Sequence, residues 1–242
     1  MTTIFLFIGL AAFFAGGVAA IAGFGIGSIL TPLLGLQIGV KLAVAAVSLP
    51  HLAGTAVRFV RMRKWLDAGV FRSFGITSAV GGLAGAVLHA VLGDLALTGV
   101  FSALLLFAGT MGLTGRSDRL RFGPGTAWLA GLGSGVLGGL VGNQGGIRSA
   151  ALLGFSLDRH AFVATATGIA LIVDAARIPV YLYTTWTDLV AHWPFVLGLT
   201  VAVVAGTLAG EQVLRRIPER LFQIVISSLL ILLGVVMALE LG

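Results

Sequence analysis

The sequence predicts an all-α polytopic membrane protein, and composition, hydropathy and the pattern of apolar runs all favour this fold class. Hydrophobic residues make up 58% of the 242 residues and charged residues only 10%, with a mean hydropathy of +1.08. An ordinary soluble domain carries about 25% charged residues. So few charges could not cover a water-exposed surface around so much apolar mass. The composition excludes a soluble enzyme, a nucleic-acid-binding protein and a disordered chain.

The apolar runs predict the number and kind of membrane segments. One crossing needs about 20 apolar residues. The first and fifth runs are too long for one crossing, and glycine clusters interrupt them at 23–27 and 142–146. We therefore expect each half of the chain to contain a broken or re-entrant segment followed by three transmembrane helices. The runs lie at about 4–35, 39–57, 70–92, 95–113, 125–156, 160–182, 189–210 and 221–241.

The two halves align with each other, which indicates an internal duplication. The repeat is much longer than that of a solenoid protein. We assign the first membrane repeat to 1–113, a basic linker to 114–124 and the second membrane repeat to 125–242. A shift of 119 residues places Gly23 on Gly142, Gly27 on Gly146, Gly35 on Gly154, Ser48 on Thr167 and Arg58 on Arg177.

Charge placement predicts that the halves are inverted. Basic residues gather in cytoplasmic loops of membrane proteins. If each broken segment dips in and returns, 13 of the 15 basic residues face the cytoplasm, from the segments 58–72, 116–121, 148–159 and 215–220. With eight ordinary crossings, the last of these segments would face outside. We therefore expect two inverted repeats in the cell membrane, with a bacterial inner membrane as the natural location. The same rule explains the net charge of +6.

The two glycine clusters are the predicted binding site. Non-helical backbone at membrane depth is tolerated only where protein or water satisfies its polar groups. A helix break also exposes N–H groups and a partial positive charge that suit an anion. Paired broken segments in two matching halves indicate a transporter's midplane site. The predicted site residues are Gly23, Phe24, Gly25, Ile26, Gly27, Gly142, Asn143, Gln144, Gly145 and Gly146.

Other glycines are better explained by close helix packing. Small residues spaced by three or four positions bring membrane helices together. This interpretation stays open as an alternative for the clusters themselves. It is the preferred one for Gly81, Gly82, Gly85, Gly131, Gly135, Gly138 and Gly139.

At this point the chain resembles the TauE/SafE family of sulfite-exporter-like membrane transporters. The resemblance rests on Gly23-Phe24-Gly25-Ile26-Gly27 with Pro32-Leu33-Leu34, and on Gly142-Asn143-Gln144-Gly145-Gly146. It covers essentially the whole chain and implies transport of sulfite, organosulfonates or related sulfur-containing or carboxylate anions. The family's usual G-x-G-G-G is interrupted here by Ile26 and Gln144, and Ala151 stands where the family has a proline.

Polar residues within the spans complete the predicted site. Asp174 and Arg177 share one helix face. They either form a structural clamp or present a guanidinium fork to an oxyanion. His51 is a candidate carrier of a coupling proton, with a neutral core histidine as the alternative. Ser48 and Thr167 either donate hydroxyls to the anion or bond back to the preceding helical turn.

Three further residues are expected outside the site or are left open. Arg58 is predicted to be a cytoplasmic anchor beside other basic residues. Arg148 is either a cytoplasmic charge or a cation at a cavity mouth that attracts anions. His89 is expected at the membrane interface, near the end of a span.

The sequence and the resemblance therefore predict a carrier, expected to be an exporter, of small sulfur-containing oxyanions such as sulfite or organosulfonates. It is expected to work by alternating access around a midplane site formed by two broken helices. An anion channel, or a carboxylate carrier on the same fold, is the alternative. An enzyme is not expected, because no G-x-S-G motif or paired intramembrane aspartates occur. With no Cys and four scattered His, no cofactor or metal is expected either. The expected partners are a small anion and the lipid bilayer, without nucleic acid, and a homo-oligomer is left open.

Overall fold

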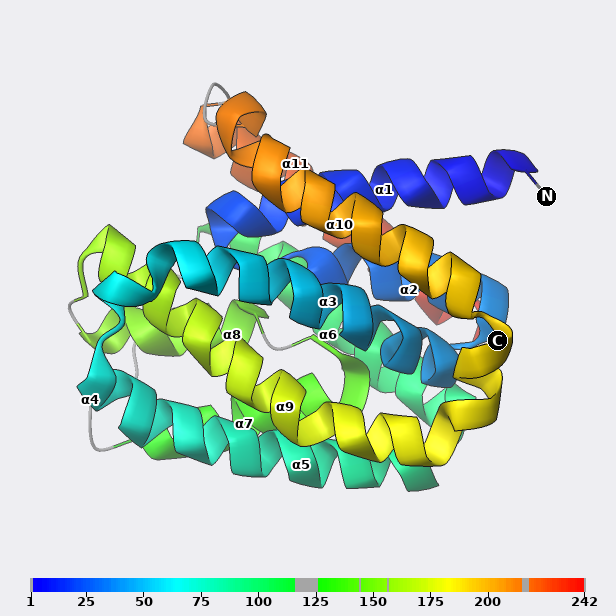
Figure 1. The fold of residues 1–242 in the computed structure, drawn as a ribbon, viewed down its shortest axis with the longest axis horizontal. Helices are drawn as coiled ribbons and strands as arrows, with labels where there is room; N and C mark the ends of the chain where they lie inside the picture. The colour runs from blue at the N-terminus through cyan, green and yellow to red at the C-terminus, as the bar shows by residue number, and fades with distance from the viewer. Residues whose placement is uncertain (1, 116–125, 144, 156, 215–217, 242) are drawn as a thin grey trace.

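The computed structural model describes residues 2–115, 126–143, 145–155, 157–214 and 218–241. Every regular element in these ranges is helical (Figure 1). In chain order the elements are α1 (Thr2–Ala22), α2 (Ile26–Ile38), α3 (Val40–Met62), η1 (Arg63–Trp65), α4 (Ala68–Val70), η2 (Phe71–Gly75), α5 (Ile76–Val91), α6 (Asp94–Thr114), α7 (Ala127–Val141), α8 (Gly145–Leu152), η4 (Leu153–Phe155), α9 (Arg159–Ala191), α10 (Trp193–Leu214) and α11 (Glu219–Leu239).

The predicted fold class, an all-α polytopic membrane protein, is confirmed. Six helical segments in the described ranges are long and apolar enough to cross a bilayer, three from each half of the chain. Shorter apolar helices precede them in both halves, at 6–22 with 26–38 and at 127–141. Each half therefore begins with a broken segment and continues with three long helices. The linker predicted at 114–124 lies almost entirely outside the described residues.

Glycines end the first helix of each broken segment. Gly23 and Gly25 have φ angles of 79° and 134°, and Gly142 has a φ angle of 71°. L-residues with a side chain rarely adopt these conformations, so the backbone can turn out of the helix here at little cost only with glycine. The predicted breaks are thus present, between α1 and α2 and between α7 and α8.

The arrangement of the long helices is the same when the two halves are exchanged. Helix α1 packs on α10 as α7 packs on α5, and α3 contacts α10 as α9 contacts α5. Helices α3 and α9 contact each other, as do α6 and α11. In Figure 1, α3 runs from right to left and α9 from left to right, and α5 and α10 are likewise opposed. These directions are those expected of inverted halves; their relation in the bilayer stays a prediction.

Glycine-lined seams hold these pairs together, as the sequence predicts for the packing glycines. A Cβ atom on Gly81 or Gly85 of α5 would overlap a backbone carbonyl of α7, and one on Gly135 or Gly139 of α7 would overlap a carbonyl of α5. The α1–α10 contact has the same character, with Gly206 against the carbonyl of Phe13. Backbones approach this closely only where no side chain intervenes.

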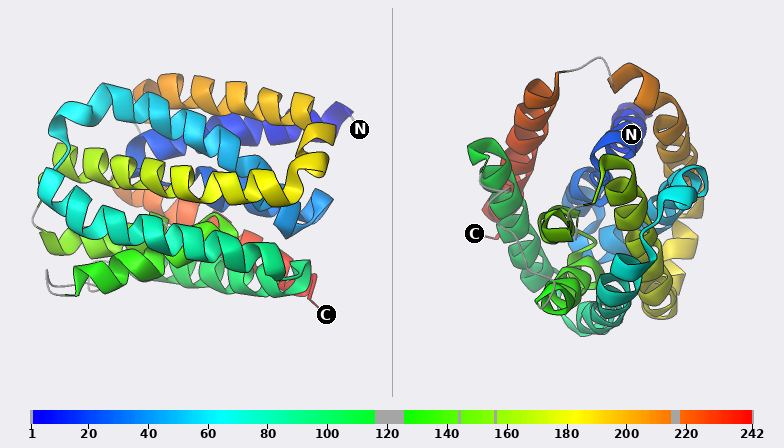
Figure 2. Two further views of the ribbon diagram at one scale, coloured as in Figure 1. Left: turned by 60° about the horizontal axis from the view of Figure 1, so that its bottom comes forward. Right: turned by 90° about the vertical axis from the view of Figure 1, so that its left-hand side faces the viewer.

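The broken segments lie inside the bundle. The end-on view on the right of Figure 2 places the short α8 within the ring of longer helices. In α2, residues 26–32 are all buried. Both breaks therefore lie where protein, and not lipid, surrounds the backbone.

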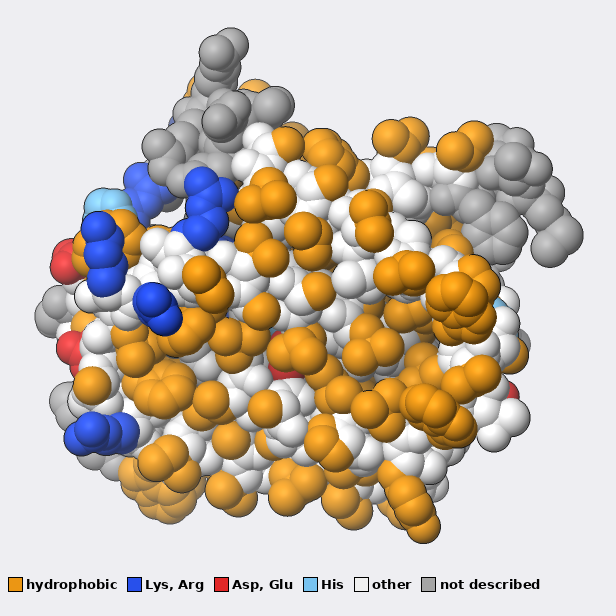
Figure 3. Space-filling view, in the orientation of Figure 1, with side chains coloured by type: hydrophobic (Ala, Val, Ile, Leu, Met, Phe, Trp, Pro, Cys, Tyr) orange, Lys and Arg blue, Asp and Glu red, His pale blue; other side chains and the backbone are white. Residues whose placement is uncertain are grey.

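Exposed positive charge gathers at one end of the molecule. In Figure 3 the blue Lys and Arg side chains lie at the left-hand end, and hydrophobic side chains cover the rest of the visible face. The segment 61–65 lies beside the start of α9, where the rings of Trp65 and His160 stack with centroids 5.1 Å apart. Arg61, Arg63, Lys64, Arg72 and Arg159 are exposed.

One sequence-based placement is wrong, and two others are narrowed. Arg58 is not a cytoplasmic anchor, because its side chain is buried inside the bundle. Arg148 is also buried, which leaves the second of its two interpretations, a cation inside the protein. His89 lies near the end of α5 as expected, but it is buried, and its Nδ1 atom lies 2.8 Å from the carbonyl oxygen of Leu140. Sequence position near the end of an apolar run is a poor guide here, since the broken segments bring polar groups to these depths.

The chain without native cysteine allows a direct test of membrane sidedness. We expect Lys64→Cys and Arg220→Cys to react with a membrane-impermeant thiol reagent only from the cytoplasmic side. Gly93→Cys, in the exposed turn between α5 and α6, should react only from the opposite side. Labelling is measured in intact cells and in inverted vesicles. Opposite-side labelling of Lys64→Cys and Arg220→Cys would contradict the inverted arrangement.

Candidate functional site

The two helix breaks contact each other at the centre of the bundle. A Cβ atom on Gly27 would overlap the carbonyl oxygen of Gly142. One on Gly145 would overlap the Phe24 side chain. The Ser28 hydroxyl donates a hydrogen bond of 3.0 Å to Oδ1 of Asn143. The predicted site residues of the two clusters are therefore brought together, although they are more than a hundred positions apart in the sequence.

Two arginines cap the helices that end at the breaks. The Arg58 guanidinium donates to the carbonyl oxygen of Ala19, and the Arg177 guanidinium donates to that of Gly138 at 2.5 Å. The shift of 119 residues places Arg58 on Arg177 and Ala19 on Gly138, so the two donors are equivalent and so are the two acceptors. Carbonyl groups in the last turn of a helix lack intrahelical partners. In each half, therefore, an arginine of the long helix, α3 or α9, bonds a carbonyl group in the last turn of the helix before the break, α1 or α7.

An ionic cluster joins the long helices α3 and α9. Nδ1 of His51 lies 2.7 Å from Oδ2 of Asp174. The other oxygen, Oδ1, accepts from Nε of Arg177 at 2.9 Å, with Nη2 at 2.8 Å. The clamp predicted between Asp174 and Arg177 therefore exists, and it extends to His51. Asp174 is fully buried, while 13% of the His51 side chain remains exposed.

A second pair of guanidinium groups meets at the first break. Arg58 and Arg148 each donate to the carbonyl oxygen of Gly23, both at 3.3 Å. Arg58 also donates from Nε to Oγ1 of Thr167 at 2.9 Å. Among the described residues, no carboxylate forms an ion pair with either side chain. Two cations lying this close in a buried place repel each other and favour an anion between or beside them.

The buried charges are unequal in number. In the described part of the chain the buried charged side chains are three arginines and one aspartate. Arg177 is matched by Asp174, whereas Arg58 and Arg148 are not. Burying an unpaired charge is expensive unless the charge is compensated. The site therefore carries a positive excess that a bound anion would neutralise.

Several buried polar atoms at the site have no hydrogen-bond partner. Among the described residues these include Nε and Nη1 of Arg148 and Nδ2 of Asn143. Oγ1 of Thr31, which lies next to Gly142, and Oγ1 of Thr55 are in the same state. Buried donors are nearly always bonded in proteins. A set of unbonded donors around helix breaks is what an oxyanion, with its many acceptor lone pairs, can satisfy.

The other predicted site residues lie at or near the helix breaks, and each makes different contacts. Ser48 bonds back to the carbonyl of Ala45 at 2.6 Å, and Thr167 to that of Val163 at 2.6 Å. This is the local alternative that the sequence left open. Ile26 begins α2 beside the first break, and Gly146 lies in α8. Gln144 lies outside the described residues.

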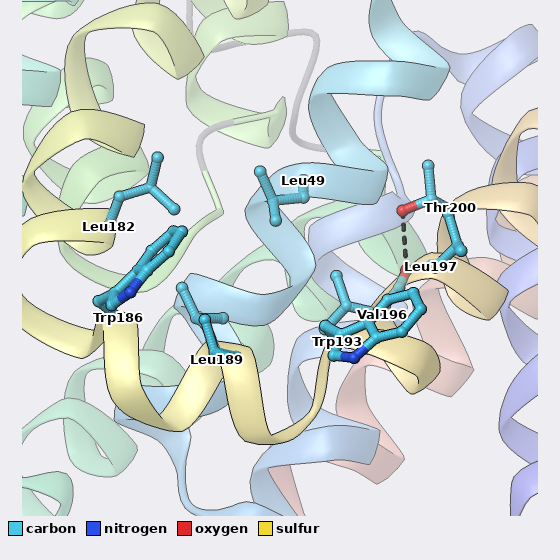
Figure 4. A pocket seen from close by; sticks show the side chains of 9 residues that line it. Leu49, Leu182, Trp186, Leu189, Trp193, Val196, Leu197 and Thr200 are labelled. Carbon is cyan, nitrogen blue, oxygen red and sulfur yellow. Dashed lines mark hydrogen bonds between the residues drawn. The ribbon is translucent and has the colours of Figure 1, made fainter.

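A pocket of about 260 Å³ lies elsewhere, between α3, α9 and α10 (Figure 4). Leucine, valine and two tryptophan side chains line it. The Thr200 hydroxyl, which also lines the pocket, donates to the carbonyl oxygen of Val196. A pocket with so apolar a lining does not suit a small anion, so the helix breaks are the stronger candidate site.

The chain matches a known family of membrane proteins. The model of the family described as "Sulfite exporter TauE/SafE" matches residues 8–237. The chain belongs to the TauE/SafE family. Searches of the curated proteins and of the solved structures found no match to this chain. Membership makes this TauE/SafE protein a membrane transporter of the sulfite or anion type, which confirms the resemblance described above.

The structure adds two residues to the candidate TauE/SafE site, one that the sequence interpretation placed elsewhere and one that it left open. These are Arg58 and Arg148, which contribute the uncompensated positive charge. A sequence signal for Arg58 existed, because the shift of 119 residues places it on Arg177, an arginine within a span. For Arg148, its place directly after the second glycine cluster was the signal.

We expect the Asp174–Arg177 pair to be required for stability. Asp174→Asn should lower the melting temperature measured in detergent, because removing one partner of a buried ion pair costs about 3–5 kcal/mol. In the double variant with Arg177→Gln, the loss of stability should be smaller than the sum of the losses in the two single variants. The difference, which is the interaction free energy of the pair, should be about 0.5–3 kcal/mol. Asp188→Asn, on an exposed position of the same helix, is the control. Strictly additive losses would show that the pair does not interact.

Proposed function

We propose that this TauE/SafE protein carries small sulfur-containing oxyanions, such as sulfite and organosulfonates, by alternating access around the two helix breaks. The observation that carries the proposal is the convergence of Arg58 and Arg148 on the carbonyl oxygen of Gly23 without a carboxylate partner. A small oxyanion would supply the missing negative charge and would accept from the donors that lack partners.

The chemistry of the donors favours an oxyanion over a spherical ion. A guanidinium group is planar and offers several N–H donors in a fixed geometry that suits paired oxygen atoms. Nε and Nη1 of Arg148 and Nδ2 of Asn143 are available for such bonds. Sulfite and sulfonate groups each present three oxygens on one sulfur. The first turn of α2, which begins one residue after Gly25, adds the partial positive charge of a helix N-terminus.

The two breaks give the carrier two places to change conformation. Each is a short non-helical stretch between rigid helices, and glycines there tolerate a change of backbone angle. Arg148, from the second half, bonds to the carbonyl of Gly23 in the first half. An anion that bound both Arg58 and Arg148 would weaken this contact and so couple occupancy to the arrangement of the halves. Alternating opening on the two sides would follow from the repeated architecture.

Substitution of the two arginines tests the proposal. Arg148→Gln and Arg58→Gln should each reduce sulfite exchange in proteoliposomes about 10- to 100-fold, since a hydrogen bond to a charged group contributes about 1.5–3 kcal/mol. Arg159→Gln, exposed at the start of α9, should exchange normally. Retention of insertion and of the melting temperature is checked for each variant. Normal exchange by Arg148→Gln would refute this placement of the site.

The same vesicles distinguish a carrier from a channel. Labelled sulfite should enter faster when unlabelled sulfite is present inside, because a carrier returns more quickly when loaded. A pore shows no such acceleration, and its absence would favour the channel. Competition by acetate as strong as that by methanesulfonate would favour a carboxylate carrier.

Glycine substitutions test the role of the breaks. We expect Gly25→Leu and Gly145→Leu to abolish sulfite exchange while the protein still inserts into the membrane. At Gly25 the φ angle of 134° disfavours a side chain, and at Gly145 a side chain would collide with Phe24. Gly198→Leu is the matched control, since Gly198 is exposed and has open space around it. Normal exchange by the two break variants would show that these glycines serve packing alone.

A further inference from the structure

We propose that His51, held by Asp174, binds a proton that travels together with the anion, so that the carrier is an anion–proton symporter. This inference rests on the proposed function and adds the coupling ion to it. The observations that carry it are the geometry of the His51–Asp174 contact, its place between the two halves, and the charges that surround it.

The geometry leaves the histidine ring able to gain and lose a proton without breaking its contact. Nδ1 lies 2.7 Å from Oδ2 of Asp174, a carboxylate that accepts but does not donate. The hydrogen atom of this bond therefore lies on Nδ1. The second nitrogen, Nε2, is free to take up a proton or to release it. The carboxylate fixes the ring orientation.

Asp174 itself is a poor proton carrier. Arg177 and His51 occupy its two oxygen atoms, and the side chain is fully buried. It also interacts electrostatically with Arg58 and Arg148. His51, with 13% of its side chain exposed, is the member of the cluster that a proton can reach.

Among the described residues, His51 is the histidine that contacts Asp174 directly. Two other titratable side chains lie on the far side of Arg177: Tyr181, whose ring centroid is 5.8 Å from the guanidinium carbon, and His89, whose ring is 4.9 Å from that of Tyr181. The charged groups facing the cluster are Asp174 and Arg177 on α9, Arg58 on its own helix α3 and Arg148 on α8. The neighbouring helices α2 and α7, and residues 193–210 of α10, carry no titratable side chain. Arginine side chains keep their proton near neutral pH. Of the groups named here, His51 is the one that is both bonded to Asp174 and partly exposed.

Coupling to the anion follows from Coulomb attraction. A proton on His51 adds a positive charge to the buried interior that also holds Arg58 and Arg148, and an anion adds a negative one. Each ligand therefore strengthens the binding of the other, and thermodynamic linkage makes the effect reciprocal. The loaded carrier takes one proton at Nε2 on the side where the anion enters and releases it on the side where the anion leaves.

The location of the pair suits this role. His51 belongs to the first half and Asp174 to the second, and their helices α3 and α9 are counterparts that contact each other. A motion of one half against the other must change this contact. The proton site and the moving boundary are therefore the same place.

Methanesulfonate is the right probe for the test. Sulfite changes its own charge near neutral pH, whereas a sulfonate stays a monoanion, so any pH effect on its transport belongs to the protein. Proteoliposomes with the membrane potential set to zero by potassium and valinomycin receive an outside pH one unit below the inside pH. At one proton per anion, the wild type should accumulate labelled methanesulfonate up to about tenfold, because one pH unit is equivalent to a tenfold concentration ratio.

The test variant is His51→Asn, which keeps an N–H donor toward Asp174 and cannot take up a proton. Its accumulation ratio should fall to about one, while exchange of labelled for unlabelled methanesulfonate remains measurable in the same vesicles. His192→Asn, at the end of α9, is the control and should accumulate like the wild type. Accumulation by His51→Asn would overturn the inference.

Two other outcomes are equally decisive. Wild-type exchange without accumulation would overturn proton coupling and leave the proposed anion carrier intact, whereas no exchange of either sulfite or methanesulfonate would overturn both. If His51→Asn does not exchange, the thermal shift caused by methanesulfonate in detergent at acidic and alkaline pH decides. Loss of the wild-type pH dependence in the variant supports the inference, and its persistence overturns it.

Discussion

The need to satisfy two interrupted helices inside a bilayer determines the rest of this structure. No water is available at that depth to bond carbonyl groups at a helix end, so side chains must do so. Arg58 and Arg177 perform this task at equivalent places, and both are buried. Their positive charges then require compensation. Asp174 meets this requirement for Arg177. For Arg58, with Arg148 beside it, a transported anion is the proposed answer.

The departure from symmetry is as informative as the symmetry. The shift of 119 residues places Thr55 where the second half has Asp174. Threonine carries no charge, and its hydroxyl has no hydrogen-bond partner. Had both positions been aspartate, each arginine would have its own carboxylate and the excess positive charge would shrink. The difference at this pair of positions leaves Arg177 with a carboxylate partner and Arg58 without one.

Much of the fold was predictable from the sequence, because hydrophobic length and glycine clusters act locally. The breaks at 23–25 and after Val141, and the three long helices of each half, follow from these patterns. The Asp174–Arg177 clamp was also predictable, since three residues along a helix bring side chains together. The role of Arg58 was not predicted correctly, because its neighbours Arg61 and Arg63 suggested a surface loop. Burial of Arg58 depends on a carbonyl of α1, almost forty residues away in the chain. Such a contact leaves no periodic trace in one sequence.

The glycine seams have a consequence for how the protein is assembled. Helix α1 packs on α10 and α5 on α7, so each tightly packed pair takes one member from each copy. Neither copy alone contains a complete pair. During synthesis α1 enters the membrane long before α10 exists, and its glycine face must remain without its partner until the chain is nearly finished. The duplicated halves are therefore interlocked parts of one folding unit, and separating them would leave each with an unfilled helix surface.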